Sequence, residues 1–106
     1  MSQPFTAIAT LIAKAGQQDA LEQHLRALLE PTRAEAGCGQ YDLHQDLANP
    51  LAFYMIEQWS SDEALQAHDA SAHIQNFRAK AGDFLEHFDL KRLRTVACPL
   101  PPTRTL

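Results

Sequence analysis

The sequence has few cysteines and no long apolar run, which argues against a disulfide-rich, a cysteine-metal and a membrane-spanning protein. Its 106 residues include two cysteines, Cys38 and Cys98, which lie far apart. A disulfide framework needs more cysteines, and cysteine metal motifs need closer pairs. The apolar runs are far shorter than the ~20 residues that cross a membrane, and no basic leader precedes the first of them. We therefore expect no membrane partner, a cytoplasmic location and two thiols that act as small core or loop residues.

Positive charge is also scarce. Nine Lys and Arg face thirteen Asp and Glu, which gives a formal net charge of −4. Nucleic acids are bound by basic faces, so we expect no nucleic-acid partner. The G-x-G-x-x-G pattern of dinucleotide sites and the H-E-x-x-H pattern of zinc enzymes are both missing from the sequence. We therefore expect neither a dinucleotide nor a zinc ion of that type.

What the sequence does have is the pattern of one small α+β domain. Two-residue alternation predicts strands over residues 5–14, 40–46, 51–59 and 87–96. In the first and third of these, both alternate sets are apolar, which is typical of a strand covered on both faces. The turn residues at 47–50 predict a hairpin between the second and third strands.

Helical spacing appears between the strands. Leu21, Leu25, Leu28 and Leu29 predict a helix over 17–30, which Pro31 either kinks or ends. Ser60 and Glu63 have the spacing of a capping box, which predicts a helix over 61–69. Ser71 is a candidate cap for another helix. The apolar stripe of that helix would consist of Ile74, Phe77, Ala81, Phe84 and Leu85.

The resulting order, β-α-β-β-α-β, predicts a ferredoxin-like fold with a four-stranded antiparallel sheet. Helices would cover one face of the sheet and leave the other face bare and apolar. Because a bare apolar face rarely stays exposed, we expect a second copy to cover it, giving a homodimer whose two sheets form one barrel. Residues 1–98 would form the domain, and the proline-rich residues 99–106 an extended tail.

Several short segments resemble the antibiotic biosynthesis monooxygenase domain, and most closely its small quinol monooxygenases. The segments are 15–16 (AG), 31–33 (PTR), 35–38 (EAGC), 41–44 (YDLH), 55–59 (MIEQW), 65–68 (LQAH) and 71–73 (SAH). The resemblance extends over about residues 5–96. It implies a dimeric α+β barrel with a pocket between sheet and helices. It also implies oxidation of a small quinol or phenol by O2 as co-substrate, without flavin, haem or metal.

His68, His73 and Glu57 are the candidate catalytic residues. Histidine side chains in general exchange a proton near neutral pH, so His68 is a candidate base for a phenolic proton. His73 would lie in the first turn of its helix, whose positive end favours a neutral acceptor. Glu57 shares a strand face with apolar residues, so it must be paired, hydrated or neutral. The structural alternatives are a hydrogen bond between His68 and a strand carboxylate such as Glu57, and a salt bridge from Glu57 to an arginine of the neighbouring strand or of a partner subunit.

Five further residues are candidates for substrate binding: Trp59 as a stacking wall, Tyr54, His44, Phe77 and Arg78. Tyr54 should lie on the opposite face of its strand from Glu57, so only one of them can face the pocket. His44 shares a polar face with Asp42 and Asp46, which favours a solvated or interface position instead. His68 and His73 have no third ligand nearby in sequence, so we expect no metal site.

Other branches of the family give further hypotheses. Resemblance to the haem-degrading branch places His68 where that branch has Trp, and Arg78 near its helical His, which excludes haem degradation. Resemblance to the polyketide-tailoring branch retains Trp59 and Arg78 but lacks its Asn and Tyr. An isomerase of phosphorylated autoinducer-2 stays open, with Arg78 or Lys80 as phosphate ligand. So does a dimeric, non-enzymatic binding or stress-associated protein whose histidines are structural.

Overall fold

Residues 3–97 are the part of the chain that the computed structural model describes. The expected strands and helices are all present there, and a short 3-10 turn follows the last helix. In chain order they are β1 (Phe5–Ala13), α1 (Gln18–Arg33), β2 (Cys38–Gln45), β3 (Ala52–Trp59), α2 (Asp62–Asp69), α3 (Ala72–Lys80), the 3-10 turn η1 (Ala81–Asp83) and β4 (Leu85–Leu93). Cys98 and the tail predicted at 99–106 lie outside the described residues.

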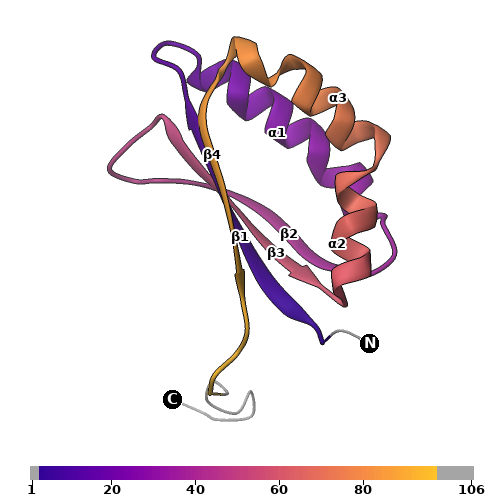
Figure 1. Cartoon of the computed structure of the whole chain (residues 1–106). Helices are drawn as coiled ribbons and strands as arrows, with labels where there is room; N and C mark the ends of the chain where they lie inside the picture. The colour runs from indigo at the N-terminus through magenta and orange to yellow at the C-terminus, as the bar shows by residue number, and fades with distance from the viewer. Residues whose placement is uncertain (1–2, 98–106) are drawn as a thin grey trace.

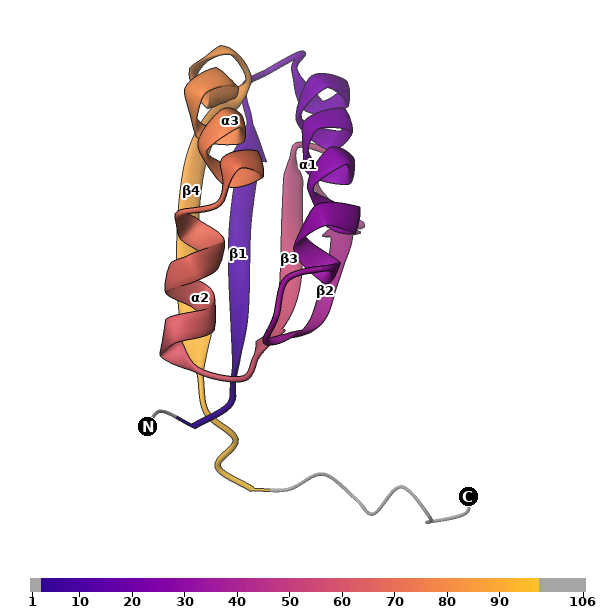
Figure 2. The same ribbon diagram turned by 90° about the vertical axis from the view of Figure 1, so that its right-hand side faces the viewer.

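The strands form one sheet in the order β2-β3-β1-β4, and every neighbouring pair is antiparallel. This arrangement confirms the ferredoxin-like α+β fold. Within the described residues, the helices all lie on one side of the sheet and the other side carries none (Figure 1). Seen from the helical side, α1 forms one column and α2 and α3 form a second column end to end (Figure 2). We call the helix-covered side of the sheet the inner face and the other side the outer face.

The core lies between the inner face and the helices. The odd-numbered residues of β1 from Ala7 to Ala13 are buried, and those of β3 from Phe53 to Trp59 are buried as well. Helix α1 contributes Leu21, Leu25 and Leu28 from the predicted stripe. Pro31 lies inside α1, which continues to Arg33, so the proline does not end the helix. Because Pro31 lies in the last turn, its missing N–H costs one hydrogen bond at the end of the helix.

The outer face is less uniformly apolar than the sequence pattern predicts. Its centre carries Ile8, Ile12 and Ile56, all half-buried. The edge strands add polar residues to the same face, namely Asp42 and His44 from β2 and His87, Asp89 and Lys91 from β4. In the central strands β1 and β3, the residues on both faces are therefore mainly apolar, as predicted. In the edge strands β2 and β4, the residues on the outer face are mainly polar.

Two predicted helix boundaries were wrong. Ser61, not Ser60, caps α2, because the Ser61 hydroxyl accepts from the backbone N–H of Ala64 at 3.1 Å. The Ser71 cap of α3 is confirmed, since its hydroxyl accepts from Ile74 N–H. Helix α3 ends at Lys80. Phe84 and Leu85 were predicted to belong to this helix, but they lie beyond it, and Leu85 begins β4. In residues 3–97 no helix combines the length and apolarity that crossing a membrane requires.

Candidate functional site

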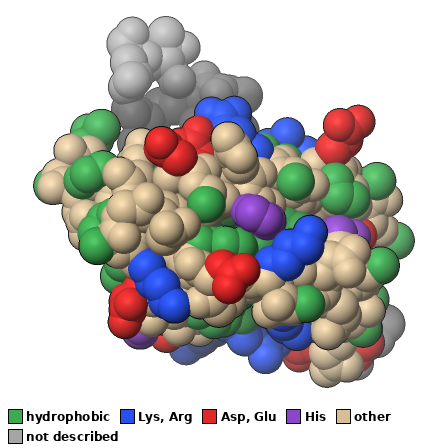
Figure 3. Space-filling model, turned by 90° about the horizontal axis from the view of Figure 1, so that it is seen from above, with side chains coloured by type: hydrophobic (Ala, Val, Ile, Leu, Met, Phe, Trp, Pro, Cys, Tyr) green, Lys and Arg blue, Asp and Glu red, His purple; other side chains and the backbone are tan. Residues whose placement is uncertain are grey.

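A cavity of about 230 Å³ lies between the inner face and the helices. Its walls are mostly apolar side chains from β1, β3, β4 and all three α-helices. Phe88 lines it and is 52% exposed, so the cavity opens beside β4. Figure 3 shows hydrophobic side chains gathered in the middle of one face, among acidic, basic and histidine side chains. The polar or charged residues in the cavity wall are Tyr41, Glu57, His68, Asp69 and Arg78.

Glu57 is a carboxyl group in an apolar place. It lies on the inner face of β3 and is 3% exposed. The indole Nε1 of Trp59 donates a hydrogen bond of 2.8 Å to its Oε1. Burial raises the pKa of Glu57 to about 7, the nearby charges of Asp69 and Glu35 add to this, and the Trp59 bond opposes it. Glu57 is therefore held by an indole rather than by the arginine that the salt-bridge alternative required, and it gains or loses a proton near neutral pH.

His68 is almost completely buried at the last turn of α2. Its ring packs against Trp59, with centroids 4.8 Å apart, and against Tyr41 at 5.4 Å. Its Nδ1 lies 2.8 Å from Oε2 of Glu35. The alternative in which His68 bonds a strand carboxylate such as Glu57 is therefore wrong, because its carboxylate partner is Glu35, in the turn after α1.

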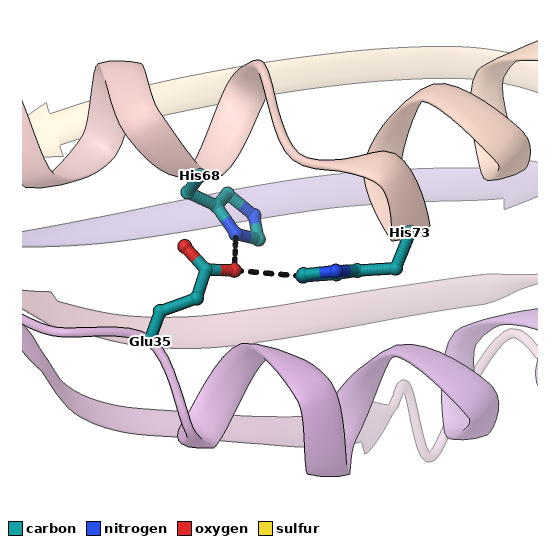
Figure 4. A group of neighbouring side chains, drawn as sticks. All are labelled: Glu35, His68 and His73. Carbon is teal, nitrogen blue, oxygen red and sulfur yellow. Dashed lines mark hydrogen bonds and ion pairs between the residues drawn. The ribbon is translucent and has the colours of Figure 1, made fainter.

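His73 contacts the same oxygen of Glu35. Its Nε2 lies 2.7 Å from Glu35 Oε2, and Figure 4 shows the carboxylate pointing at both rings. A carboxylate oxygen can only accept, so both ring nitrogens act as donors here. His73 does lie in the first turn of α3, as predicted. It faces Glu35 as a donor, however, and is not among the residues that line the cavity.

Glu35 reaches the histidines because the chain turns sharply after α1. The backbone N–H of Glu35 donates to Thr32 O at 3.0 Å, and Cys38 N–H donates back to Glu35 O at 3.2 Å. Arg33 fixes this turn against β2, since its Nε donates to the Tyr41 carbonyl at 3.0 Å. Ser71, between α2 and α3, donates to the His68 carbonyl at 2.6 Å. The three side chains therefore come from three backbone segments that are each hydrogen-bonded in place.

Two of the predicted substrate-binding residues line the cavity. Phe77 and Arg78 contribute from α3, and Arg78 is paired with Asp69 Oδ1 at 3.2 Å. Trp59, expected as a wall, is not among the lining residues. It is fully buried, where it holds Glu57 and packs on His68.

Tyr54 and His44 lie on the outer face, away from the cavity. The two residues pair with each other in register, Tyr54 on β3 and His44 on β2. Tyr54 donates to Asp46 Oδ2 at 3.2 Å, and His44 Nδ1 is 3.2 Å from the Asp42 carbonyl. Of the pair Tyr54 and Glu57, it is Glu57 that faces the cavity.

Three residues of the site were not predicted from the sequence, namely Glu35, Tyr41 and Asp69. Tyr41 could have been found, since it alternates with Leu43 on the apolar set of its strand. It is 4% exposed, and burial together with the Glu57 charge raises the pKa of its phenol far above the ordinary value. Tyr41 therefore remains protonated at neutral pH and forms part of the cavity wall. Glu35 lies in a turn without periodicity, 33 and 38 residues from its partners, so no local signal marks it.

Comparison with known proteins gives consistent matches. Residues 4–80 match the family model described as antibiotic biosynthesis monooxygenase. The chain is 36% identical over 85 residues to "Putative monooxygenase Rv0793" of Mycobacterium tuberculosis, covering 80% of this chain and 83% of that protein. It is 31% identical over 77 residues to "Putative monooxygenase YcnE" of Bacillus subtilis, covering 73% and 81% of the two chains.

A solved structure agrees with these matches. The crystal structure of PA3566 from Pseudomonas aeruginosa superposes with a TM-score of 0.87 at 47% identity. The superposition covers 92% of this chain and 98% of PA3566. The sheet order, the cavity under the helices and these matches lead to one conclusion: the chain belongs to the antibiotic biosynthesis monooxygenase family.

Proposed function

We propose that the protein oxidises a small quinol or related phenol with O2 and uses no bound cofactor. Family membership supports a monooxygenase-type function. The observation that carries the finer proposal is a buried histidine, oriented by a carboxylate, in the wall of an apolar cavity. The proposal rests on the side chains that face this cavity.

The cavity suits a small aromatic substrate. Its volume of about 230 Å³ is below the range of about 300–1,000 Å³ that is usual for drug-sized ligands. Phe77, Met55 and the leucines of α1 supply apolar walls on which a flat ring can pack. Such walls also exclude water, which protects a reactive anion from side reactions.

His68 is the proposed base. Because Glu35 accepts from Nδ1–H, the proton of a neutral ring is held on that nitrogen, and Nε2 is left as the acceptor. Nε2 hydrogen-bonds to none of the described residues. It can therefore take a phenolic proton from a ring in the cavity. Glu57, with a pKa of about 7, is placed to exchange a second proton with the substrate.

The reaction balances without an external reductant. Removal of a phenolic proton gives an electron-rich phenolate, which transfers electrons to O2 and forms a new C–O bond on the ring. The peroxide O–O bond then breaks, and one oxygen atom leaves as water. Quinol plus O2 thus gives hydroxyquinone plus water, with both reducing electrons supplied by the quinol. The protein contributes the base, the orientation and the dry cavity.

Oxygen uptake with reduced naphthoquinone tests the proposal. In His68→Gln the rate above the enzyme-free background should fall by about 100-fold, in the range usual for loss of a general base. The matched control is His87→Gln, because His87 is exposed on the outer face of β4. Its rate should match that of the wild type. Circular dichroism would check that both variants keep the fold. A wild type that is inactive on a panel of quinols would contradict the proposal.

A phosphosugar isomerase is the second candidate function, and one observation favours it. Arg78 is the one Lys or Arg among the described residues that line the cavity. A phosphate would have to compete with Asp69, which already pairs with Arg78. Tight binding of a phosphosugar, lost in Arg78→Gln and without oxygen uptake, would favour this function. Loss of stability alone in the histidine variants would favour a non-enzymatic binding protein.

A further inference from the structure

We propose that Glu35, His68 and His73 form a binding site for one divalent transition-metal ion of the Zn²⁺ type. One ligand atom from each residue, Nδ1 of His68, Nε2 of His73 and a carboxylate oxygen of Glu35, lies within 4.8 Å of the other two. All three side chains point to one place (Figure 4). The inference goes beyond the proposed oxidation and does not depend on it.

The donor set determines the class of ion. Two imidazole nitrogens and one carboxylate oxygen are a usual ligand set of zinc enzymes, which leave a further coordination position open. Imidazole favours Zn²⁺, Co²⁺, Ni²⁺ and Cu²⁺ over Mg²⁺ and Ca²⁺, which prefer sites built from oxygen ligands alone. We therefore expect Zn²⁺ and Co²⁺ to bind, and Mg²⁺ and Ca²⁺ not to compete with them.

The distances fit a site that closes on itself when no ion is bound. Metal–ligand bonds of about 2.0–2.2 Å place tetrahedral ligand atoms roughly 3.4 Å apart. Here the two N···O distances are 2.8 and 2.7 Å, so each must open by about 0.6 Å. The side chains of Glu35 and His73 are 16% and 22% exposed, which leaves them room to rotate and gives an ion a route in.

The surroundings hold the ligands in a binding arrangement. His68 is wedged between Tyr41 and Trp59, which fixes its ring. Ser71 links the two histidine-bearing helices, since it donates to the His68 carbonyl and its Oγ lies 3.3 Å from His73 Nε2. Outer contacts of this kind orient metal ligands and strengthen binding. A loose surface cluster of histidines would lack them.

The ion would bind Nδ1 of His68 and the Glu35 carboxylate, the two groups that orient the proposed base. In the ion-free protein, two N–H groups share one carboxylate oxygen, whereas a bound ion takes the place of both protons. Ion binding thus removes the bond that sets the tautomer of His68. The ion-free protein is accordingly the form in which the proposed oxidation takes place. Binding is measured without a quinol, so failure of one proposal leaves the other untouched.

Isothermal titration calorimetry of the full chain with Zn²⁺ tests the site. We expect equimolar, saturable binding to the wild type. Loss of even an outer contact costs about 10–100-fold in affinity, so removing a ligand should cost about 100-fold or more. Glu35→Gln and His73→Gln should both show this loss. His87→Gln is the matched control, because it removes an exposed histidine on the far side of the sheet and should bind as the wild type does.

Co²⁺ gives an independent readout, because its visible absorption reports the geometry of its ligands. A low-coordinate spectrum in the wild type that is absent in Glu35→Gln and His73→Gln supports the site. Two ligand variants are used so that misfolding of one leaves the other to decide, with circular dichroism as the check. Absence of saturable Zn²⁺ binding in the wild type would overturn the inference. So would ligand variants that fold and bind as tightly as His87→Gln.

Discussion

Burial of Glu57 in the apolar core disfavours its ionised form, so its contribution to the free energy of unfolding depends on pH. The ordinary pKa of the group is 4.5, and in the folded protein it is about 7. Between these values the folded state holds a proton that the unfolded chain has lost. The free energy of unfolding therefore falls as pH rises through this window and stays lower above it. Over 2.5 pH units this effect is about 3 kcal/mol at most.

Glu57→Gln should remove this pH dependence. We expect the variant to be about as stable as the wild type near pH 3, which lies below both pKa values, so the wild-type carboxyl is neutral in both states. At pH 8 we expect it to be more stable than the wild type by about 1–3 kcal/mol, because an amide has no charge to bury. Urea unfolding at both pH values measures the difference. A stability difference that is the same at both would show that Glu57 does not titrate in this window.

Trp59→Phe tests the bond that holds Glu57. Phenylalanine keeps an aromatic ring in the core but has no N–H to donate to Glu57 Oε1. Hydrogen bonds to a charged group are worth about 1.5–3 kcal/mol and neutral ones about 1 kcal/mol. The loss of stability should therefore be larger at pH 8, where Glu57 is ionised, than at pH 5. The loss of ring volume acts equally at both, so the difference isolates the hydrogen bond.

The same substitution should change the titration of Glu57 itself. The Trp59 bond lowers the pKa of Glu57, so its removal should raise that pKa above its present value of about 7. Carboxyl ¹³C NMR on the wild type and on Trp59→Phe measures the shift. An unchanged or lower pKa in the variant would contradict the arrangement described here.

At the scale of the elements, the turn between α1 and β2 delivers Glu35 to the histidines, and Gly37 makes this turn possible. Gly37 has φ of +88°, and a Cβ there would lie 2.6 Å from both Ala64 Cβ and Ser60 Oγ. Gly16 provides a matched comparison. It has φ of +81° but nothing within 4 Å of its added Cβ. The two glycines therefore separate backbone strain from crowding.

Gly37→Ala should destabilise the protein more than Gly16→Ala. A left-handed conformation costs a residue with a Cβ about 1–2 kcal/mol, which is the expected loss for Gly16→Ala. Crowding adds about 1–3 kcal/mol at Gly37, because α2 has to move. Thermal or urea unfolding of both variants measures the difference. Equal losses would mean that the turn and α2 can separate freely.

Much of the arrangement of elements could be predicted, because strand and helix periods are local. Alternation places Glu57 and Tyr54 on opposite faces of β3. Two adjacent serines made the cap of α2 ambiguous, since only the backbone conformation shows that Ser61 accepts from Ala64. The pairing of Glu35 with His68 and His73 could not be predicted, because it depends on how α1 packs beside α2 and α3.

At the scale of the molecule, the outer face has the composition of an interface. Ile8 and Ile56 are paired in register at its centre, with Ile12 and Tyr54 beside them. Asp42, His44, Asp89 and Lys91 stand on the edge strands around this apolar centre. An apolar centre with a polar rim is typical of protein–protein contacts. We propose that the outer faces of two copies pack together, as the alternation in β1 and β3 first suggested.

Ile56→Asp should break such a dimer. A two-fold interface carries the substitution twice, so two charges would be buried with no partner. Loss of a central contact of about 2 kcal/mol or more in each copy should raise the dissociation constant by about 100-fold or more. Sedimentation velocity should then show a dimeric wild type and a folded, monomeric variant. Ala27→Asp is the matched control, because Ala27 is exposed on α1 in the helical layer, and this variant should stay dimeric. A wild type that sediments as a monomer would contradict the proposal, because the outer-face residues Ile8, Ile12 and Ile56 would then have no partner copy to cover them.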